Sequence, residues 1–185
     1  MRLLSQEDGI KGLTLARDVI RAVVQNDQIV LPPLPSVFSE KRGVFVTLKR
    51  EGELRGCIGL PLPVMSLKDA IVEAATSAAL QDPRFLPVRS LELPSIHVEL
   101  TVLSIPEEIP GSSEERHNHL TIGRHGLIIR GRGRSGLLLP QVASEYQWNP
   151  IEFLDQTCRK AGLPPGCWRD ETISVLRFEG QIFSE

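Results

Sequence analysis

Cys57 is the residue around which chemistry is most readily built, because the stretch GELRGCIGLP places it between glycines and close to an arginine. Arg55 could stabilise a thiolate, and Gly56 and Gly59 would let a substrate approach the backbone. A small side chain packed into a crowded strand would leave the same pattern. Cys57 is therefore a candidate nucleophile, and a packing residue is the open alternative.

Strand alternation adds further side chains to this group, because residues two apart in a strand point to the same face. If residues 54–60 and 97–103 lie in one sheet with their polar faces aligned, the side chains that converge are Arg55, Cys57, His97, Glu99 and Thr101. His97 is then a candidate general base that Glu99 could orient. An Arg55–Glu99 ion pair with a histidine at the rim is the noncatalytic alternative.

Arg84 is a candidate for ligand binding, since it follows the proline-stiffened turn of DPRF. An ion pair or cap at a helix end is its alternative role. The candidate catalytic residues are thus Cys57 and His97. The candidate substrate-binding residues are Arg55, Gly56, Gly59, Arg84, Glu99 and Thr101.

Two other polar clusters give weaker signals. No cysteine or carboxylate pattern completes a metal site around the three histidines of RHNHLTIGRH, so no metal or other cofactor is expected. Four arginines near a glycine-rich turn could hold an anion, namely Arg124, Arg130, Arg132 and Arg134. Their spacing matches neither a P-loop nor a dinucleotide fingerprint, which favours a charged hairpin turn.

The 185 residues suffice for one domain or two closely packed subdomains. A formal net charge of -2 gives no general attraction to nucleic acids or anionic membranes. The apolar runs are too short to span a bilayer and MRLLSQEDGI lacks a signal-peptide core, so a cytoplasmic protein is expected. Three cysteines without such a signal predict reduced thiols, with Cys158 and Cys167 as packing residues.

The elements that must position these residues follow from capping patterns and periodicity. Ser5 with Asp8 predicts a helix that ends near Asn26, and Ser66 with Asp69 predicts a second helix. Asn149 begins a third that runs through Ala161. Strands are predicted over 43–50, 53–60, 95–103 and 171–183, with two short ones around the glycine and arginine turn.

The block LRGCIG at 54–59 resembles the signature of the AMME chromosomal region (AMMECR) domain family. Further blocks agree in order along nearly the whole chain: DPRF, VELTVLS, HGL, GLLLPQVA and the FL...C.KAGL pattern of 153–163. The resemblance implies an α/β fold of the α+β type, with two subdomains that each contain an antiparallel sheet and flanking helices. Residues 1–105 and 171–185 would form the larger subdomain and residues 106–170 the smaller.

The family resemblance also implies a cleft between the subdomains, with the LRGCIG side chains directed toward it. It supplies no settled reaction. A pathway link to Memo-like and radical-SAM proteins follows from the neighbours of prokaryotic family members. Two hypotheses remain: a protein that acts on a protein or other large ligand at Cys57, and a noncatalytic binding or adaptor module in a modification pathway. Nucleic-acid binding ranks below both.

Overall fold

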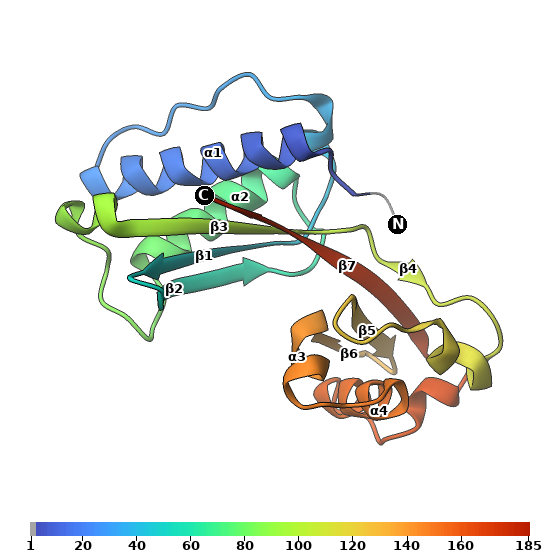
Figure 1. Ribbon diagram of the computed structural model, residues 1–185. Coiled ribbons are helices and arrows are strands. Elements are labelled where there is room, and N and C mark those ends of the chain that lie inside the picture. Colours follow the sequence, from blue (N-terminus) through green and yellow to red (C-terminus); the bar gives the residue numbers. More distant parts are fainter. Residues whose placement is uncertain (1–2) are drawn as a thin grey trace. The chain divides into compact units, whose positions relative to one another are not determined.

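The computed structural model describes residues 3–185 and shows an α+β fold, in which helices pack on antiparallel strands (Figure 1). The described chain divides into two compact units, a larger one of residues 3–105 and 181–185 and a smaller one of residues 106–180. Residues 1 and 2 of the expected larger subdomain lie outside the described residues. The family resemblance implies that 171–180 belong to the larger subdomain, but these residues fall in the smaller unit because β7 (Ser174–Ser184) pairs there with β5 (His125–Gly131).

The larger unit places two helices on one face of its sheet (Figure 1). The helices are α1 (Gln6–Gln25) and α2 (Leu67–Leu80). The strands are β1 (Val44–Arg50), β2 (Glu53–Leu60) and β3 (Ile96–Leu103), with the last residues of β7 beyond β3. Short 3-10 helices occur at η1 (Ser36–Ser39) and η2 (Ser90–Ser95). Because β1 pairs with β2 on one side and β3 on the other, β2 forms an edge of this sheet.

Local capping explains where both helices begin. The Ser5 hydroxyl accepts a hydrogen bond from the backbone N–H of Asp8, and the Ser66 hydroxyl does the same for Asp69. Asn26 ends α1 in the left-handed conformation that asparagine tolerates. Both predicted helices are confirmed.

Alternation along the strands separates a buried face from a half-exposed one. The side chains that pack toward α1 and α2 are Val44, Val46 and Leu48 of β1 and Val98, Leu100 and Val102 of β3, as the sequence predicts. The opposite face carries mostly polar side chains, including Thr47, Lys49, Cys57 and Glu99. This polar face is where the candidate residues lie.

The smaller unit has its own core around Phe153, Leu154 and Trp168. Its strands are β4 (Glu107–Glu108), β5, β6 (Arg134–Leu138) and most of β7. Its helices are α3 (Pro140–Glu145), α4 (Pro150–Lys160), η3 (Ser113–His119) and η4 (Cys167–Arg169). The α4 helix and its Asn149 cap are confirmed, whereas the single-turn α3 was not foreseen. None of the helices within residues 3–185 has the length and apolar character needed to cross a bilayer.

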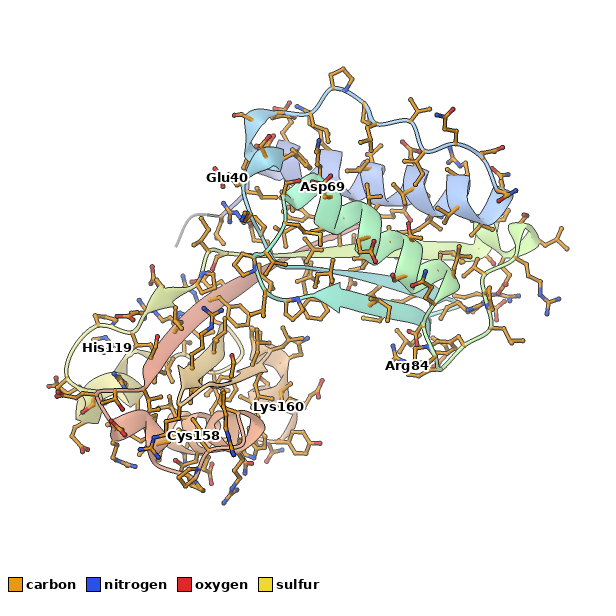
Figure 2. The ribbon with its side chains drawn as sticks, turned by 180° about the vertical axis from the view of Figure 1, so that it is seen from behind. Glu40, Asp69, Arg84, His119, Cys158 and Lys160 are labelled. Carbon is orange, nitrogen blue, oxygen red and sulfur yellow. A yellow bond between two sulfur atoms is a disulfide. The ribbon has the colours of Figure 1, made fainter. Side chains whose placement is uncertain are left out.

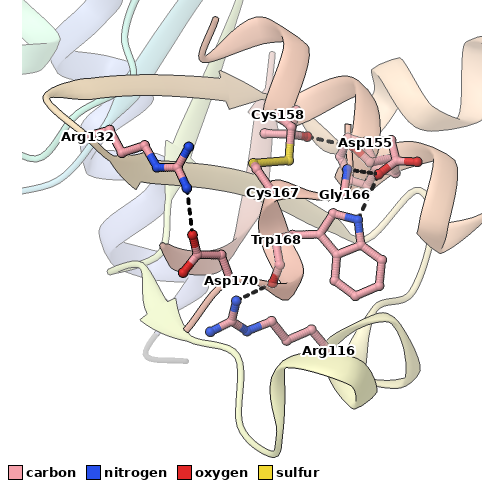
Figure 3. Close-up of a disulfide and its surroundings, with 10 residues drawn as sticks. Arg116, Arg132, Asp155, Cys158, Gly166, Cys167, Trp168 and Asp170 are labelled. Carbon is pink, nitrogen blue, oxygen red and sulfur yellow. Dashed lines mark hydrogen bonds and ion pairs between the residues drawn. A yellow bond between two sulfur atoms is a disulfide. The ribbon is translucent and has the colours of Figure 1, made fainter. Parts of the chain in front are cut away.

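The arginine-rich segment forms a tight β-hairpin between β5 and β6. Arg132 and Gly133 at its tip both have positive φ, as a two-residue hairpin turn of type I′ requires. The Arg132 guanidinium donates to Asp170 at 2.8 Å (Figure 3). Arg134 donates to the carbonyl of Gly162. Two of the hairpin arginines therefore hold the hairpin against neighbouring segments of the unit.

A disulfide joins Cys158 and Cys167, and the expectation of reduced thiols at these positions is wrong (Figure 3). The Pro-Pro-Gly turn after α4 reverses the chain, so that Cys167 returns beside the helix. Asp155 fixes this return by accepting hydrogen bonds from the Gly166 backbone and the Trp168 indole, each at 2.8 Å. Both cysteines are buried, and Cys57 is the only free cysteine in the described chain.

Removal of this disulfide should destabilise the smaller unit. Replacing Cys158 and Cys167 with alanine is expected to lower the free energy of unfolding by about 2–3 kcal/mol, because the bond restricts the unfolded chain over a short loop. Urea unfolding followed by tryptophan fluorescence measures the effect in the smaller unit, since Trp148 and Trp168 both lie there. A reductant should lower the free energy of unfolding of wild type by a similar amount and leave that of the double variant unchanged. A stability difference close to zero would contradict the structural role.

Candidate functional site

Cys57 lies in the edge strand β2 directly opposite Thr47 of the central strand β1. Its thiol is half-buried and accepts a hydrogen bond from the Thr47 hydroxyl at 3.3 Å. Thr47 lies in turn opposite Glu99 of β3, so one row across the sheet reads Cys57, Thr47 and Glu99. A threonine hydroxyl is no base at neutral pH, so Thr47 cannot take the proton of the thiol.

The backbone of Cys57 is held by the DPRF turn rather than by another strand. The carboxylate of Asp82 accepts a hydrogen bond from the Cys57 N–H at 2.8 Å, and the guanidinium of Arg84 donates to the Cys57 carbonyl at 3.1 Å. Arg84 lies on the loop that follows α2 (Figure 2). The Asp82 carboxylate and the Arg84 guanidinium thus take the places that the C=O and N–H groups of a neighbouring strand would occupy. The turn caps this part of the exposed edge.

Asp82 and Arg84 also bind each other. The Arg84 guanidinium donates to both carboxylate oxygens, at 2.9 and 2.7 Å, and the Arg84 backbone N–H donates at 3.1 Å. These guanidinium hydrogen bonds, helped by the Cys57 N–H and opposed by burial, hold the pKa of Asp82 well below its usual 3.8. The same hydrogen bond raises the pKa of Arg84 above its ordinary value, and the nearby Cys57 side chain adds to this rise. Both groups are therefore charged at neutral pH.

The glycines of the signature are required by close packing. A Cβ on Gly56 would lie 2.4 Å from the carbonyl oxygen of Ala78 in α2, so only glycine lets helix and strand approach this closely. A Cβ on Gly59 would lie 2.0 Å from the ring of Phe45, which covers that position from β1. Packing thus accounts for both candidate substrate-binding glycines.

His97 shares the polar face but is not brought to Cys57. It lies opposite Lys49 on β3, with β1 between it and β2, so its Cα is about 12 Å from that of Cys57 at ordinary strand spacing. Its Nε2 is 2.9 Å from the hydroxyl of Ser184. The geometry therefore gives His97 no part as a base for this thiol.

The two remaining candidates on β3 have neighbours other than the thiol. Glu99 accepts a hydrogen bond from Lys49 at 3.0 Å, so the Arg55–Glu99 ion pair of the noncatalytic alternative is wrong. Thr101 lies opposite Phe45. The structure places both residues on the predicted face without joining them to Cys57.

Arg55 instead forms an ion pair with Glu92 of the η2 turn. Its Nε and Nη2 donate to the two carboxylate oxygens at 2.9 and 3.1 Å, and both side chains are only 15% exposed. The Glu92 carboxylate also accepts a hydrogen bond from the Arg50 guanidinium at 3.3 Å and one from the Arg89 backbone N–H at 2.9 Å. Arg55, the arginine two residues before Cys57, therefore holds the 89–95 segment onto the strand.

An open pocket of about 510 Å³ lies beside this ion pair, within the larger unit. Four arginines and one carboxylate line it, together with an aromatic ring and two leucines: Arg50, Arg55, Arg84, Arg89, Glu92, Phe85, Leu86 and Leu91. Its volume falls in the range of ligand sites in proteins. It is the place where the two sequence-predicted arginines, Arg55 and Arg84, come together.

Sequence reasoning missed the residues that join the motifs. The sequence patterns place Asp82 only in a turn and do not single out Arg89 or Glu92. The signal for Asp82 was its position next to Arg84 and just past a helix, where a carboxylate commonly bonds local N–H groups. For Glu92, the spacing of three residues from Arg89 at the start of a turn was the signal.

The Glu92 ion pair predicts a specific pH dependence. The Arg55 hydrogen bonds, with the Arg89 N–H, lower the pKa of Glu92 from 4.5 to about 2. Because the folded protein favours the charged form, its contribution to stability is full above pH 4.5 and is lost as the pH falls through about 2. Glu92→Gln should therefore be less stable than wild type at neutral pH, and the difference should shrink across this window.

Urea unfolding followed by far-ultraviolet circular dichroism, at pH values from neutral to about 2, measures this dependence. Glu7→Gln, which removes an exposed carboxyl from α1, is the matched control and should stay parallel to wild type. A constant difference between wild type and Glu92→Gln across the whole range would contradict the proposed linkage.

Comparison with known proteins identifies the family. The AMMECR1 family model matches residues 13–183. A protein of Thermococcus gammatolerans is 50% identical, with 100% of this chain and 94% of the relative covered. A protein of Methanocaldococcus jannaschii is 48% identical with the same coverage.

A solved structure has a similar fold. The crystal structure of an uncharacterised protein from Pyrococcus horikoshii is 44% identical, covers 98% of this chain and 93% of that one, and superposes with a TM-score of 0.79. The likeness therefore extends over nearly the whole chain in both sequence and structure. Together with the match of the family model, it shows that the chain belongs to the AMMECR1 family.

Proposed function

We propose that this chain is a noncatalytic binding module that receives a segment of another protein on its larger unit. The observation that carries the proposal is the engagement of Cys57. Asp82 and Arg84 hold its backbone, and its thiol contacts a threonine hydroxyl. A catalytic cysteine needs a base at the sulfur. The Cys57 side chain meets the Thr47 hydroxyl and the Arg84 guanidinium, and neither accepts a proton at neutral pH. That guanidinium also bonds Asp82 and the Cys57 carbonyl oxygen.

The arginine pocket supports binding as the alternative to chemistry. Three of its four guanidiniums, those of Arg50, Arg55 and Arg84, are held by Glu92 or Asp82, so these three can bind a ligand with little loss of conformational freedom. Exposed leucines at the pocket are the kind of surface that protein partners cover. A binding module needs such a fixed surface and no nucleophile.

Thiol chemistry at Cys57 is the second candidate function, because Cys57 is a free and only half-buried cysteine. The rate of alkylation by iodoacetamide, resolved by peptide mass spectrometry, distinguishes the two functions. For a packing role we expect slower alkylation of Cys57 in the folded protein than in urea at every pH tested. An activated nucleophile would react faster in the folded protein than in urea, and that result would overturn the proposal.

Cys57→Ala serves as the mass-spectrometric control, since it removes the only free thiol of the described chain. Reaction of Cys158 or Cys167 would reveal reduction of the disulfide and would invalidate that sample. The reagent is small, so slow labelling reports on the environment of the thiol itself.

A further inference from the structure

The lining of the arginine pocket is strongly unbalanced in charge. Four guanidiniums face a single carboxylate, that of Glu92. Glu92 is shared between Arg50 and Arg55, and Arg84 is paired with Asp82, which does not line the pocket. The side chain of Arg89 makes no hydrogen bond or ion pair within residues 3–185. The pocket therefore retains positive charge that its own acids do not neutralise.

Two of these guanidiniums are available to a ligand. Arg84 keeps 53% of its side chain exposed although it bonds Asp82, and Arg89 is exposed. A carboxylate that enters the pocket can accept hydrogen bonds from a guanidinium with bidentate geometry. The chemistry of this lining selects an anion.

Phe85 gives the pocket an ordered apolar surface. The guanidinium carbons of Arg84 and Arg55 lie 5.5 and 6.0 Å from the centroid of its ring. Arginine positioned near an aromatic ring in this way is attracted to the ring face, which restricts the guanidinium before any ligand arrives. The arginines are thus partly preorganised for binding.

The leucines of the pocket narrow the class of ligand. Leu86 is 73% exposed and Leu91 is 93% exposed, which is unusual for such apolar side chains. A nucleic acid would require further basic residues along its backbone, whereas this pocket adjoins leucines and the chain is net negative. A peptide that alternates carboxylates with apolar side chains satisfies both the arginines and the leucines.

We infer that the arginine pocket binds an acidic segment of a partner protein in which aspartate or glutamate stands beside leucine-like residues. The inference names the ligand class for the binding function proposed above and rests on it. Arg84 and Arg89 bind the carboxylates, Phe85 supports the segment, and Leu86 and Leu91 cover its apolar side chains.

A random-peptide display selection on the full chain tests this ligand class without assuming a partner. Enriched sequences should carry acidic residues next to leucine, isoleucine or phenylalanine. The affinity of a synthetic peptide with the enriched sequence is then measured by fluorescence anisotropy. Arg89→Glu should weaken that affinity by about tenfold or more, and added salt should weaken it further.

Arg159→Glu is the matched control, because Arg159 is an exposed arginine of the smaller unit outside the pocket. Its affinity should stay within about twofold of wild type. The inference is overturned by no acidic enrichment, by equal binding of the peptide to Arg89→Glu and wild type, or by displacement of the peptide by equimolar single-stranded oligonucleotide. A phosphoserine peptide that binds more than about tenfold tighter than its glutamate counterpart would also overturn it in favour of a phosphorylated ligand.

Failure of this inference can be distinguished from failure of the proposed function. The peptide experiment depends on Arg89, whereas the alkylation experiment depends on Cys57. A reactive Cys57 alongside Arg89-dependent peptide binding would remove the noncatalytic assignment and keep the ligand class. An unreactive Cys57 with no acidic peptide bound would keep the noncatalytic assignment and remove the ligand class.

Discussion

Replacing Asp82 with alanine is expected to lower the free energy of unfolding by about 3 kcal/mol, because one buried carboxylate serves two segments of the larger unit. Its loss leaves the N–H of Cys57 without an acceptor and the guanidinium of Arg84 without its partner. The loop after α2 would then separate from the edge of β2. Urea unfolding followed by far-ultraviolet circular dichroism measures the change.

Asp18→Ala is the control for this prediction, since it removes an exposed carboxylate of α1 with a loose ion pair of 3.7 Å to Arg21. Its effect should stay below about 0.5 kcal/mol. The lowered pKa of Asp82 adds a second expectation: its contribution is full above pH 3.8 and is lost as the pH falls below that value. A cost for Asp82→Ala no greater than that of Asp18→Ala would show that the turn does not hold the strand.

Replacing Gly56 with alanine is expected to destabilise the larger unit by about 2 kcal/mol, although alanine is the smallest change available. The added Cβ would stand 2.4 Å from the carbonyl oxygen of Ala78, which belongs to the backbone of α2 and cannot turn aside. Helix and strand must therefore separate. Thermal unfolding followed by far-ultraviolet circular dichroism measures the loss.

Cys57→Ala, one residue further along β2, is the matched substitution. It removes only the sulfur and its contact with Thr47, so it should cost less than about 1 kcal/mol. Comparing Gly56→Ala with Cys57→Ala shows whether the LRGCIG signature is needed for close packing at its glycines or for its thiol. If Cys57→Ala proved the more damaging of the two, the signature would depend on the thiol and not on its glycines.

Local structure was largely predictable from the sequence. Short-range capping predicts where three helices begin, at Ser5, Ser66 and Asn149. Period-two alternation predicts the buried faces of β1 and β3. These features depend on neighbours within a few residues. They are therefore encoded wherever the local pattern is strong.

Long-range pairings were not predictable in the same way. Alternation placed His97 and Cys57 on one face but could not show that β1 lies between their strands, because several registers preserve the same alternation. The contact of Asp82 with Cys57 spans 25 residues, and no local pattern specifies it. The disulfide could not be predicted because an odd number of cysteines favours free thiols and no local pattern specifies which two would pair.

The most direct measurement for the central claim is the Kd of one selected acidic peptide for wild type, Cys57→Ala and Arg89→Glu under identical conditions. The account predicts that Cys57→Ala binds within about twofold of wild type and that Arg89→Glu binds about tenfold more weakly. Mass spectrometry should recover the peptide unchanged. Loss of binding in Cys57→Ala with Arg89→Glu unaffected, or covalent change of the peptide by wild type alone, would contradict a binding module centred on the arginine pocket.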